Sequence, residues 1–395
     1  MSAAAGPAEQ RRLALAGAVA LLLGIGLGRY AFTPLIPSLV SAGWFSAEQT
    51  AELGAINLLG YLFGAASADR LARALGPRRV IGGALALLTV SLFACALPAG
   101  MLWYGLWRLV AGWAAATLTI VVTPAVMARM PVARRPAASA AVFTGMGVGT
   151  ITASLLVPLL ADAGIGATWA AVGLVAAVLG AWSWHRVWRH LPRGRAAPAT
   201  VEEDAAGPVP WLAIGLIVTA YGLTSAGYVP HSLYWVDYIA RELGRGLAVG
   251  NGYWLVLGVG GVIGPGLAGL AAARLGFRRA LVIAFAAMTA ATALPLVSSA
   301  APALGVSSLL VGAMVPAIIT LTAGVVVELS PAARRQQIWG WATLSFALTQ
   351  TIGGFGMSRL YAAAGSYLDT IAAGALLLVA GSACVIAALA LQRGD

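Results

Sequence analysis

The stretch LGPRR, at Leu75–Arg79, returns as LGFRR at Leu275–Arg279, 200 residues further along the chain. The stretch PVARR at Pro131–Arg135 returns as PAARR at Pro331–Arg335 with the same offset. A single five-residue match is weak, but several matches at one offset indicate an internal repeat. The sequence therefore predicts that the chain consists of two similar halves, one following the other.

The composition predicts that both halves lie in a membrane. Of the 395 residues, 60% are hydrophobic and 9% are charged, and the mean hydropathy is +0.89. Soluble domains carry about 25% charged residues. Helices are the expected spanning elements, because lipid offers no partner for free backbone groups. The twelve predicted spans are 13–40, 50–69, 80–97, 101–128, 137–160, 164–186, 211–239, 247–272, 280–297, 302–328, 338–360 and 367–391.

The basic residues follow a topological pattern. All 24 are arginine, and 19 of them fall on one side of the membrane if the N-terminus is placed inside. Arg241, Arg245 and Arg359 fall on the other side, while Arg29 and Arg108 lie within spans. This bias is the positive-inside pattern of an even number of spans with both termini in the cytoplasm. Topology therefore explains the net charge of +11, and no nucleic-acid partner is expected.

The repeat and the polar segments divide the chain into three parts. Residues 1–188 are expected to form one six-helix bundle and residues 211–395 a second, joined by a Pro- and Ala-rich cytoplasmic linker at 189–210. The first span is too long for a signal peptide and lacks a small-residue cleavage site, so it is expected to remain. Cys95 and Cys384 fall near opposite membrane faces, so no disulfide is expected.

Two parallel six-helix repeats are typical of the major facilitator superfamily (MFS). The stretch ASADRLARALGPRRV resembles the superfamily's loop between its second and third helices, with four extra residues. The matching residues are Asp69, Arg70, Gly76, Arg78 and Arg79. RLVAGWAAA at Arg108–Ala116 resembles the pattern of the fourth helix. The resemblance implies an all-α membrane protein with twelve transmembrane helices, a monomeric state, and a central cavity lined by the spans 13–40, 101–128, 211–239 and 302–328.

Two short motifs narrow the resemblance. GRYAFTPLIP at Gly28–Pro37 and YGLTSAGYVP at Tyr221–Pro230 are similar to the YbfB/YjiJ-type branch of the superfamily. Proton-coupled drug exporters of the superfamily usually carry a Gly-Pro dipeptide in the fifth helix. Here Gly149 is followed by Thr150, which weighs against drug export.

Arg29 and Arg108 are the leading candidate site residues. A charge within a span costs roughly 2.5–3.5 kcal/mol and normally faces a cavity or a partner. A guanidinium stays protonated and matches carboxylate or phosphate oxygens, and Glu52 is the nearest acidic candidate for pairing. We therefore expect the substrate to supply the missing anion. The structural alternatives are that Arg108 braces helices through backbone carbonyls, and that Arg29 satisfies the carbonyls freed by Pro34 and Pro37.

Polar residues in the spans 13–40, 50–69, 211–239 and 338–360 are further candidates for substrate contact. In 211–239, spacing of three to four residues places a polar and aromatic stripe on one helix face. Buried amides have an alternative explanation, as hydrogen-bonding groups between helices. These candidates are Thr33, Asn57, Tyr61, Tyr221, Ser225, Tyr228 and Gln350.

Proton coupling and gating each have their own candidates. Coupling requires a group that titrates near neutrality, for which His231, Asp237 and Glu52 are candidates; His231 could equally be a local hydrogen-bonding residue. A cytoplasmic gate is expected at the inner helix ends, where Glu328 is expected to pair with a loop arginine. The gate candidates are Asp69, Arg70, Arg78 and Glu328.

Other functional classes are disfavoured. Glycine patterns such as GVGGVIG do not follow a strand as nucleotide-binding loops do, and Gly260–Gly264 is better explained as a face for close helix packing. No catalytic residue, metal or cofactor is predicted, and the chain is not expected to be an enzyme.

The sequence thus predicts a secondary active transporter in the bacterial inner membrane. It would move a small, carboxylate-like organic anion by alternating access, with proton coupling, and its partners would be this substrate and membrane lipids. Two alternatives stay open: proton-driven efflux of amphipathic drugs or metabolites, and a non-transporting membrane receptor.

Overall fold

The computed structural model describes residues 6–192 and 209–392, and within these ranges it contains helices and turns but no strand. The predicted linker therefore lies mostly outside the described residues, as do Arg193, Arg195 and Arg393. The first half contains α1 (Pro7–Leu21), the π-helix η1 (Leu22–Leu27), the 3-10 turn η2 (Thr33–Leu35), α2 (Ile36–Ser41), α3 (Ala47–Leu75), α4 (Pro77–Ala94), α5 (Gly100–Met127), η3 (Val132–Arg134), α6 (Arg135–Leu159), α7 (Ile165–Arg186) and η4 (Trp188–His190). The second half contains α8 (Trp211–Gly227), the π-helix η5 (Pro230–Tyr234), α9 (Trp235–Asp237), the π-helix η6 (Tyr238–Glu242), α10 (Leu247–Val297), α11 (Ala301–Leu329), α12 (Ala332–Ala364) and α13 (Tyr367–Leu391).

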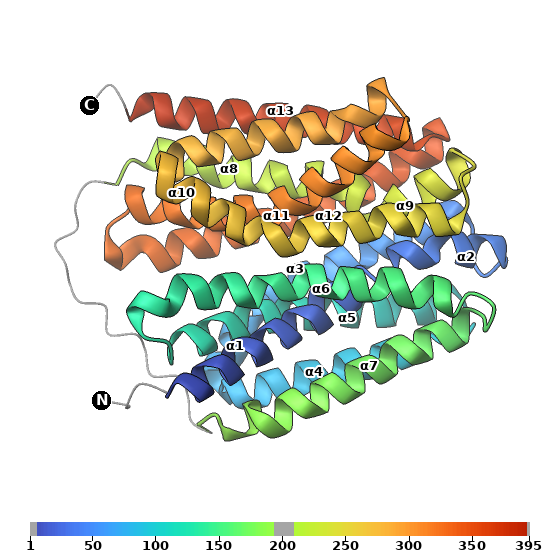
Figure 1. Ribbon diagram of the computed structural model, residues 1–395, viewed down its shortest axis with the longest axis horizontal. Coiled ribbons are helices and arrows are strands. Elements are labelled where there is room, and N and C mark those ends of the chain that lie inside the picture. Colours follow the sequence, from blue (N-terminus) through green and yellow to red (C-terminus); the bar gives the residue numbers. More distant parts are fainter. Residues whose placement is uncertain (1–5, 193–208, 393–395) are drawn as a thin grey trace.

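The long helices run roughly side by side, and the two ends of the chain lie at the same end of the molecule (Figure 1). Within the first half α3 and α4 pack on α5, and α1 packs on α6. Within the second half α10 packs on α11, while α8 packs on α12 and α13. The two halves meet where α6 packs on α10 and α3 packs on α12. We call the end that carries the chain termini the terminal end, and the opposite one the far end.

The sequence repeat is also a repeat of packing. A Cβ built on Gly112 would lie 2.0 Å from the backbone oxygen of Asn57, and one built on Gly312 would lie 2.0 Å from that of Leu257. Only glycine permits these two close helix crossings. A built Cβ would also lie within 2.5 Å of a backbone oxygen at Gly60, Gly64, Gly260 and Gly264. The predicted packing face at Gly260–Gly264 is confirmed.

Every predicted span overlaps a helical segment, but the count of twelve spans stays a prediction. Within the described residues, nine helices are long and apolar enough to cross a membrane. One of them, α10, covers two predicted spans and is interrupted at Gly276, where φ is +76°. Gly276 is the repeat counterpart of Gly76, which separates α3 from α4 with a φ of +83°. The helices α3 and α12, which pack on each other, are not among the nine.

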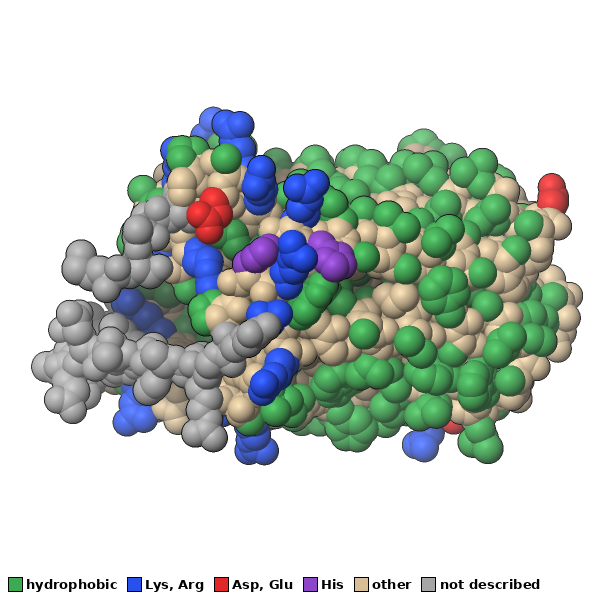
Figure 2. Space-filling view, turned by 90° about the horizontal axis from the view of Figure 1, so that it is seen from below, with side chains coloured by type: hydrophobic (Ala, Val, Ile, Leu, Met, Phe, Trp, Pro, Cys, Tyr) green, Lys and Arg blue, Asp and Glu red, His purple; other side chains and the backbone are tan. Residues whose placement is uncertain are grey.

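Charged and apolar side chains are separated on the surface. On the face in Figure 2, Arg and His side chains gather toward the left, which is the terminal end, and hydrophobic side chains cover most of the rest. Large hydrophobic residues are exposed along α4, α7, α10 and α13. An apolar belt with basic residues at one end is the pattern expected of a protein oriented in a bilayer.

Candidate functional site

The first helix of each half is interrupted at its middle. After α1, the amide of Gly28 donates to the Leu23 oxygen at 2.8 Å and the amide of Tyr30 donates to the Ile25 oxygen at 3.0 Å. These bonds span five residues, as in a π-helix, a feature that is frequent at functional sites. After α8, the π-helix η5 begins at Pro230, the repeat counterpart of Tyr30. Both interruptions lie where the two halves face each other.

Arg29 lies in the turn after η1 and reaches across to the second half. Its side chain is 3% exposed, and its Nη1 donates to Oε1 of Gln350 on α12 at 2.9 Å. Its Cζ lies 5.2 Å from the ring centroid of Tyr30 and 5.9 Å from that of Tyr61. Its Nε and Nη2 are buried without a hydrogen-bond partner. Arg29 thus presents a guanidinium between aromatic rings with part of its donor capacity unused.

Arg108 braces the interrupted first helix. Its Nη1 donates to the backbone oxygen of Gly28 at 2.9 Å, and its Cζ lies 4.4 Å from the ring centroid of Phe32. Nδ2 of Asn57 donates to the backbone oxygen of Arg108 at 2.8 Å. These contacts match the structural alternatives for Arg108 and Asn57. Nε and Nη2 of Arg108 are nevertheless buried without a partner.

The interrupted helices contact each other across the interface between the halves. Thr33 Oγ1 donates to the backbone oxygen of Ser232 at 2.6 Å. The ring of Tyr30 meets the rings of Tyr228 and Trp254 edge to face, at centroid distances of 6.4 and 5.7 Å. These contacts close the interface between the halves at the level of the interruptions.

The polar stripe of the seventh predicted span does not share one environment. Ser225 Oγ donates to the backbone oxygen of Phe346 at 2.7 Å, and the ring of Tyr221 lies 4.9 Å from that of Phe346, so both face α12. Tyr228 instead faces the first half, and His231 faces α11. Tyr221, Ser225 and Tyr228 keep the α-helical spacing of one face and meet different neighbours along it, whereas His231 lies in the π-helix η5, where wider turns change the angle between successive side chains.

A cavity of about 350 Å³ lies between the halves, on the side of these contacts that faces the terminal end. Its wall comes from α3, α5, α6, α8, α11 and α12, and it includes Tyr61 and Tyr221 of the predicted residues as well as Asp69. Because Tyr61 also contacts the guanidinium of Arg29, the cavity wall is in direct contact with this cation. The other lining residues are Ala65, Thr119, Ile120, Thr123, Pro124, Phe143, Ile319, Gln336, Trp339, Gly340, Thr343, Leu344 and Phe346.

Several of these lining residues were missed from the sequence. Thr119 and Thr123 lie one helical turn apart on α5, and this spacing could have identified them. Trp339 and Phe346 on α12 gave no such signal, because aromatic residues are equally common in packed helices. Their rings lie 5.7 and 4.9 Å from that of Tyr221, which makes this wall aromatic.

The candidates for proton coupling lie in three different environments. Glu52 is exposed. His231 is fully buried, its Nε2 lies 2.9 Å from Oγ of Ser307, and its ring stacks on that of Trp235 at a centroid distance of 4.2 Å. Nδ1 of His231 is buried without a partner.

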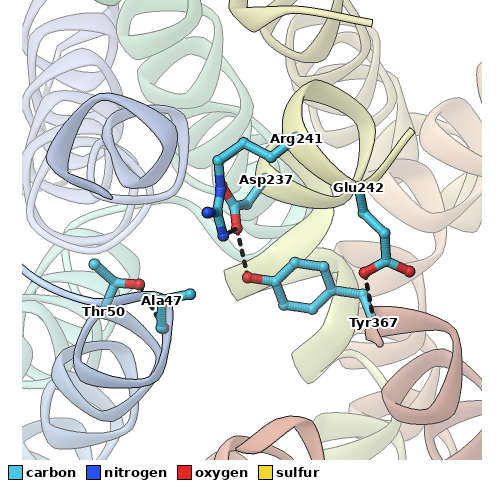
Figure 3. A network of polar contacts seen from close by, with 6 residues as sticks. All are labelled: Ala47, Thr50, Asp237, Arg241, Glu242 and Tyr367. Atoms are coloured by element: carbon cyan, nitrogen blue, oxygen red, sulfur yellow. Dashed lines mark hydrogen bonds and ion pairs between the residues drawn. The ribbon is translucent and has the colours of Figure 1, made fainter. Parts of the chain in front are cut away.

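Asp237 takes part in a network near the far end (Figure 3). Its buried carboxylate accepts two hydrogen bonds from Arg241, one of them from Nη2 at 2.6 Å, and one from the hydroxyl of Tyr367 on α13. Glu242 accepts from the backbone amide of Tyr367 at 2.8 Å. The network connects the end of the interrupted helix to the start of α13. The donors to Asp237 are the charged guanidinium of Arg241 and the neutral hydroxyl of Tyr367.

The gate candidates of the first half lie at the terminal end without pairing with each other. Asp69 pairs with Arg73, one turn further along α3, rather than with Arg70 or Arg78. Arg70 is exposed, and Cζ of Arg78 lies 5.7 Å from the ring centroid of Trp184. The extra turn between Arg70 and Gly76 places Arg73 within reach of Asp69.

Glu328 pairs with Arg278, whose Nε lies 3.1 Å from Oε2. Arg278 belongs to the second copy of the repeat motif, between two predicted spans, so the expected pairing with a loop arginine is confirmed, whereas a role in a gate stays a prediction. The pair joins α10 to α11 within the second half.

Comparisons with known proteins agree with this architecture. A crystal structure of the nucleoside transporter NupG (D323A mutant) is similar, with a TM-score of 0.70 and 14% sequence identity over 95% of this chain and 99% of that chain. This similarity shows the MFS fold. A search of curated proteins gave no match. The family described as "Uncharacterised MFS-type transporter YbfB" matches residues 21–390, so the chain belongs to this family of MFS transporters.

Proposed function

We propose that this MFS transporter carries a small organic anion that has an apolar or aromatic body. The observation that carries the proposal is the guanidinium of Arg29, which is buried, contacts the cavity wall at Tyr61, and leaves Nε and Nη2 without partners. The proposed substrate would place its anionic group at Arg29 and its body in the cavity below.

Charge balance supports an anion. Within the described residues the ion pairs involve Arg73, Arg241 and Arg278, and neither Arg29 nor Arg108 belongs to one. A buried guanidinium stays protonated, and leaving it without a counter-charge is costly. Gln350 supplies Arg29 with a neutral acceptor, which a carboxylate could replace or supplement.

The cavity lining supports an apolar or aromatic body with hydrogen-bonding groups. Tyr221, Trp339 and Phe346 provide ring faces, whereas Thr119 and Thr123 provide hydroxyls on the opposite wall. Cavities of this kind commonly hold small molecules through apolar contact and a few polar groups.

The proposal includes the membrane setting and the cycle. We place twelve spans in a bacterial inner membrane, with the basic terminal end in the cytoplasm, and the two six-helix bundles 1–188 and 211–395 rocking about the site as a monomer. The gate would close at the terminal end, near Asp69 and Glu328. Proton coupling through His231 is part of the proposal, since its Nδ1 is buried and unpartnered.

Arg29 variants test the anion. Arg29→Gln should abolish saturable uptake of the anion in proteoliposomes, and Arg29→Lys should weaken it because a point charge cannot replace the planar fork. Gln350→Glu should also lower affinity, because a carboxylate 2.9 Å from Nη1 would take the place of the substrate's charge. A charge-assisted hydrogen bond contributes about 1.5–3 kcal/mol, so dissociation constants should rise roughly 10- to 150-fold.

The substrate panel for these assays follows from the cavity. Mono- and dicarboxylates, sulfonates and phosphates should raise the unfolding temperature of the purified protein, and the matched surface variant Arg274→Gln should respond as the wild type does. Unchanged anion uptake by Arg29→Gln would remove the anion from the proposal. A pH gradient that fails to change the uptake rate would remove the proton coupling alone.

The aromatic wall also favours a second candidate, the export of amphipathic compounds. The aromatic surface of Tyr221, Trp339 and Phe346 would bind flat apolar molecules without using Arg29. Nucleosides belong in the same panel, because the structurally similar NupG is a nucleoside transporter. Binding that is lost in Trp339→Ala and kept in Arg29→Gln would favour this candidate over the anion.

A further inference from the structure

A groove lies on the outer surface of the first half, between α4 and α7. It has a volume of about 630 Å³, and its floor includes three residues without side chains, Gly82, Gly83 and Gly180. Leu85, Ala86 and Val90 are among its apolar lining residues. A groove of this kind on the apolar belt would be filled by a lipid acyl chain.

Basic and aromatic side chains lie at the terminal end of this groove. Arg79 and His185 line it, and Trp184 forms part of the wall, with Arg78 stacked on its ring. Arg79 is exposed and has no hydrogen-bond or ion-pair partner among the described residues. Nη1 of Arg189 lies 3.4 Å from Nδ1 of His185, which brings a further cation to this end. Among the described residues, no acidic side chain lines the groove.

The repeat supplies an internal comparison. A second groove, of about 560 Å³, lies between the later part of α10 and α13, and its Arg279 is the repeat counterpart of Arg79. There the counterparts of Gly82 and Gly83 are Val282 and Ile283, whose side chains occupy the floor. Its other arginine, Arg278, is already paired with Glu328. The groove of the first half therefore has a floor without side chains at these positions and more unpaired positive charge.

We propose that the α4–α7 groove is a binding site for a phospholipid with an anionic headgroup. One acyl chain lies over Gly83, beside the ring of Trp184, and the phosphate is held by Arg79 and His185. Basic pockets between transmembrane helices near the cytoplasmic surface are suited to such headgroups. This site is on the lipid-facing surface and is independent of the proposed transport substrate.

Two substitutions separate the headgroup from the acyl chain. Gly83→Leu fills the floor without a clash, because a Cβ at Gly83 would meet nothing within 4 Å. Arg79→Gln removes the charge and leaves the floor unchanged. The matched controls are Gly269→Leu, on an exposed helical glycine of α10 that also meets nothing within 4 Å, and Arg274→Gln, on an exposed arginine outside both grooves.

Native mass spectrometry of the purified full-length protein, titrated with phosphatidylglycerol or phosphatidylcholine, gives the readout. The wild type should retain phosphatidylglycerol in preference to phosphatidylcholine. Arg79→Gln should weaken phosphatidylglycerol binding about fivefold, the factor expected for one arginine near an anionic headgroup, and leave phosphatidylcholine unchanged. Gly83→Leu should remove the tightest-bound lipid of either kind, and both controls should match the wild type.

Equal loss of both lipids in Arg79→Gln would overturn the headgroup assignment. Lipid retention by Gly83→Leu that equals that of Gly269→Leu would overturn the groove as the site. If one variant does not fold, as judged by its size-exclusion profile, the other still decides the proposal.

Discussion

Gly147 on α6 lies where the two halves touch, and its substitution by alanine tests the rocking of the halves directly. A Cβ at Gly147 would lie 2.5 Å from the backbone nitrogen of Val262, 2.6 Å from the oxygen of Gly258 and 2.7 Å from the carbonyl carbon of Gly261. All three atoms belong to α10 of the other half, and all are backbone, so they cannot yield by a change of rotamer. The new methyl group therefore opposes the contact between halves.

The expected magnitude follows from the cost of overpacking, about 1–3 kcal/mol. This cost applies only while α6 and α10 touch as they do here. The gain in helix propensity from Gly to Ala, about 0.5–1 kcal/mol, applies in every conformation and therefore cancels from the free-energy difference between conformations. Gly147→Ala should therefore shift the equilibrium away from the observed arrangement by roughly 5- to 140-fold.

Distance measurements between the halves provide the assay. Spin labels at Ser41→Cys and Ala248→Cys, two exposed positions near the far end, report the separation of the halves once Cys95 and Cys384 have been replaced. In lipid nanodiscs, pulsed electron paramagnetic resonance should show a dominant short distance for the parent protein. Gly147→Ala should add a population at longer distance.

Gly145→Ala, two residues earlier on the same helix, is the matched control. Its Cβ would lie 2.0 Å from the backbone oxygen of Ala18, which is in the same half. This variant should lower the unfolding temperature without changing the distance distribution. If Gly147→Ala is folded and its distances equal those of the parent protein, the close contact of α6 and α10 does not control the conformation.

Two further predictions concern one hydrogen bond between the halves and one polar network within the second half. Thr33→Val removes the hydrogen bond to the Ser232 oxygen, which contributes about 0.5–1.5 kcal/mol. The populations of short and long distances between the halves should therefore change by about two- to tenfold. An unchanged distance distribution would show that this bond does not hold the halves together. Asp237→Asn weakens the hydrogen bonds from Arg241 and Tyr367 and should lower the unfolding temperature. The decrease should be smaller when Tyr367 is already phenylalanine, because only the bonds from Arg241 are then left to weaken; full additivity in this double-mutant cycle would contradict the coupling.

Much of the fold could be predicted because hydrophobic length and glycine spacing are local properties. The offset between Leu75–Arg79 and Leu275–Arg279 predicted two similar halves, and the same offset relates the close helix crossings at Gly112 and Gly312. The interruption near Arg29 was also expected, since Pro34 and Pro37 cannot donate backbone hydrogen bonds. The division at Gly276 was expected from the repeat, although the helix on either side of it is continuous by hydrogen bonding.

The site was predictable in part. The sequence singled out Arg29, Gln350 and Tyr61 separately, but it gave no sign that Gln350 would accept from Arg29 across 321 residues. The aromatic wall of Trp339 and Phe346 was missed because neither residue is unusual in an apolar helix. The partner of Asp69 was not predicted, since its pairing with Arg73 depends on the one extra helical turn.

The sequence by itself determined that this chain is an apolar, helical, two-fold repeated protein with a biased distribution of arginine, because these properties follow from residue order and from the exclusion of free backbone groups by lipid. Only the tertiary structure decided which buried polar groups meet. Nη1 of Arg108 donates to the backbone of Gly28 within the first half, whereas Nη1 of Arg29 donates to Gln350 of the second half and its guanidinium contacts Tyr61 of the cavity wall. The physical reason is that a hydrogen bond depends on atomic positions within a few tenths of an ångström, which are set by how the two halves pack.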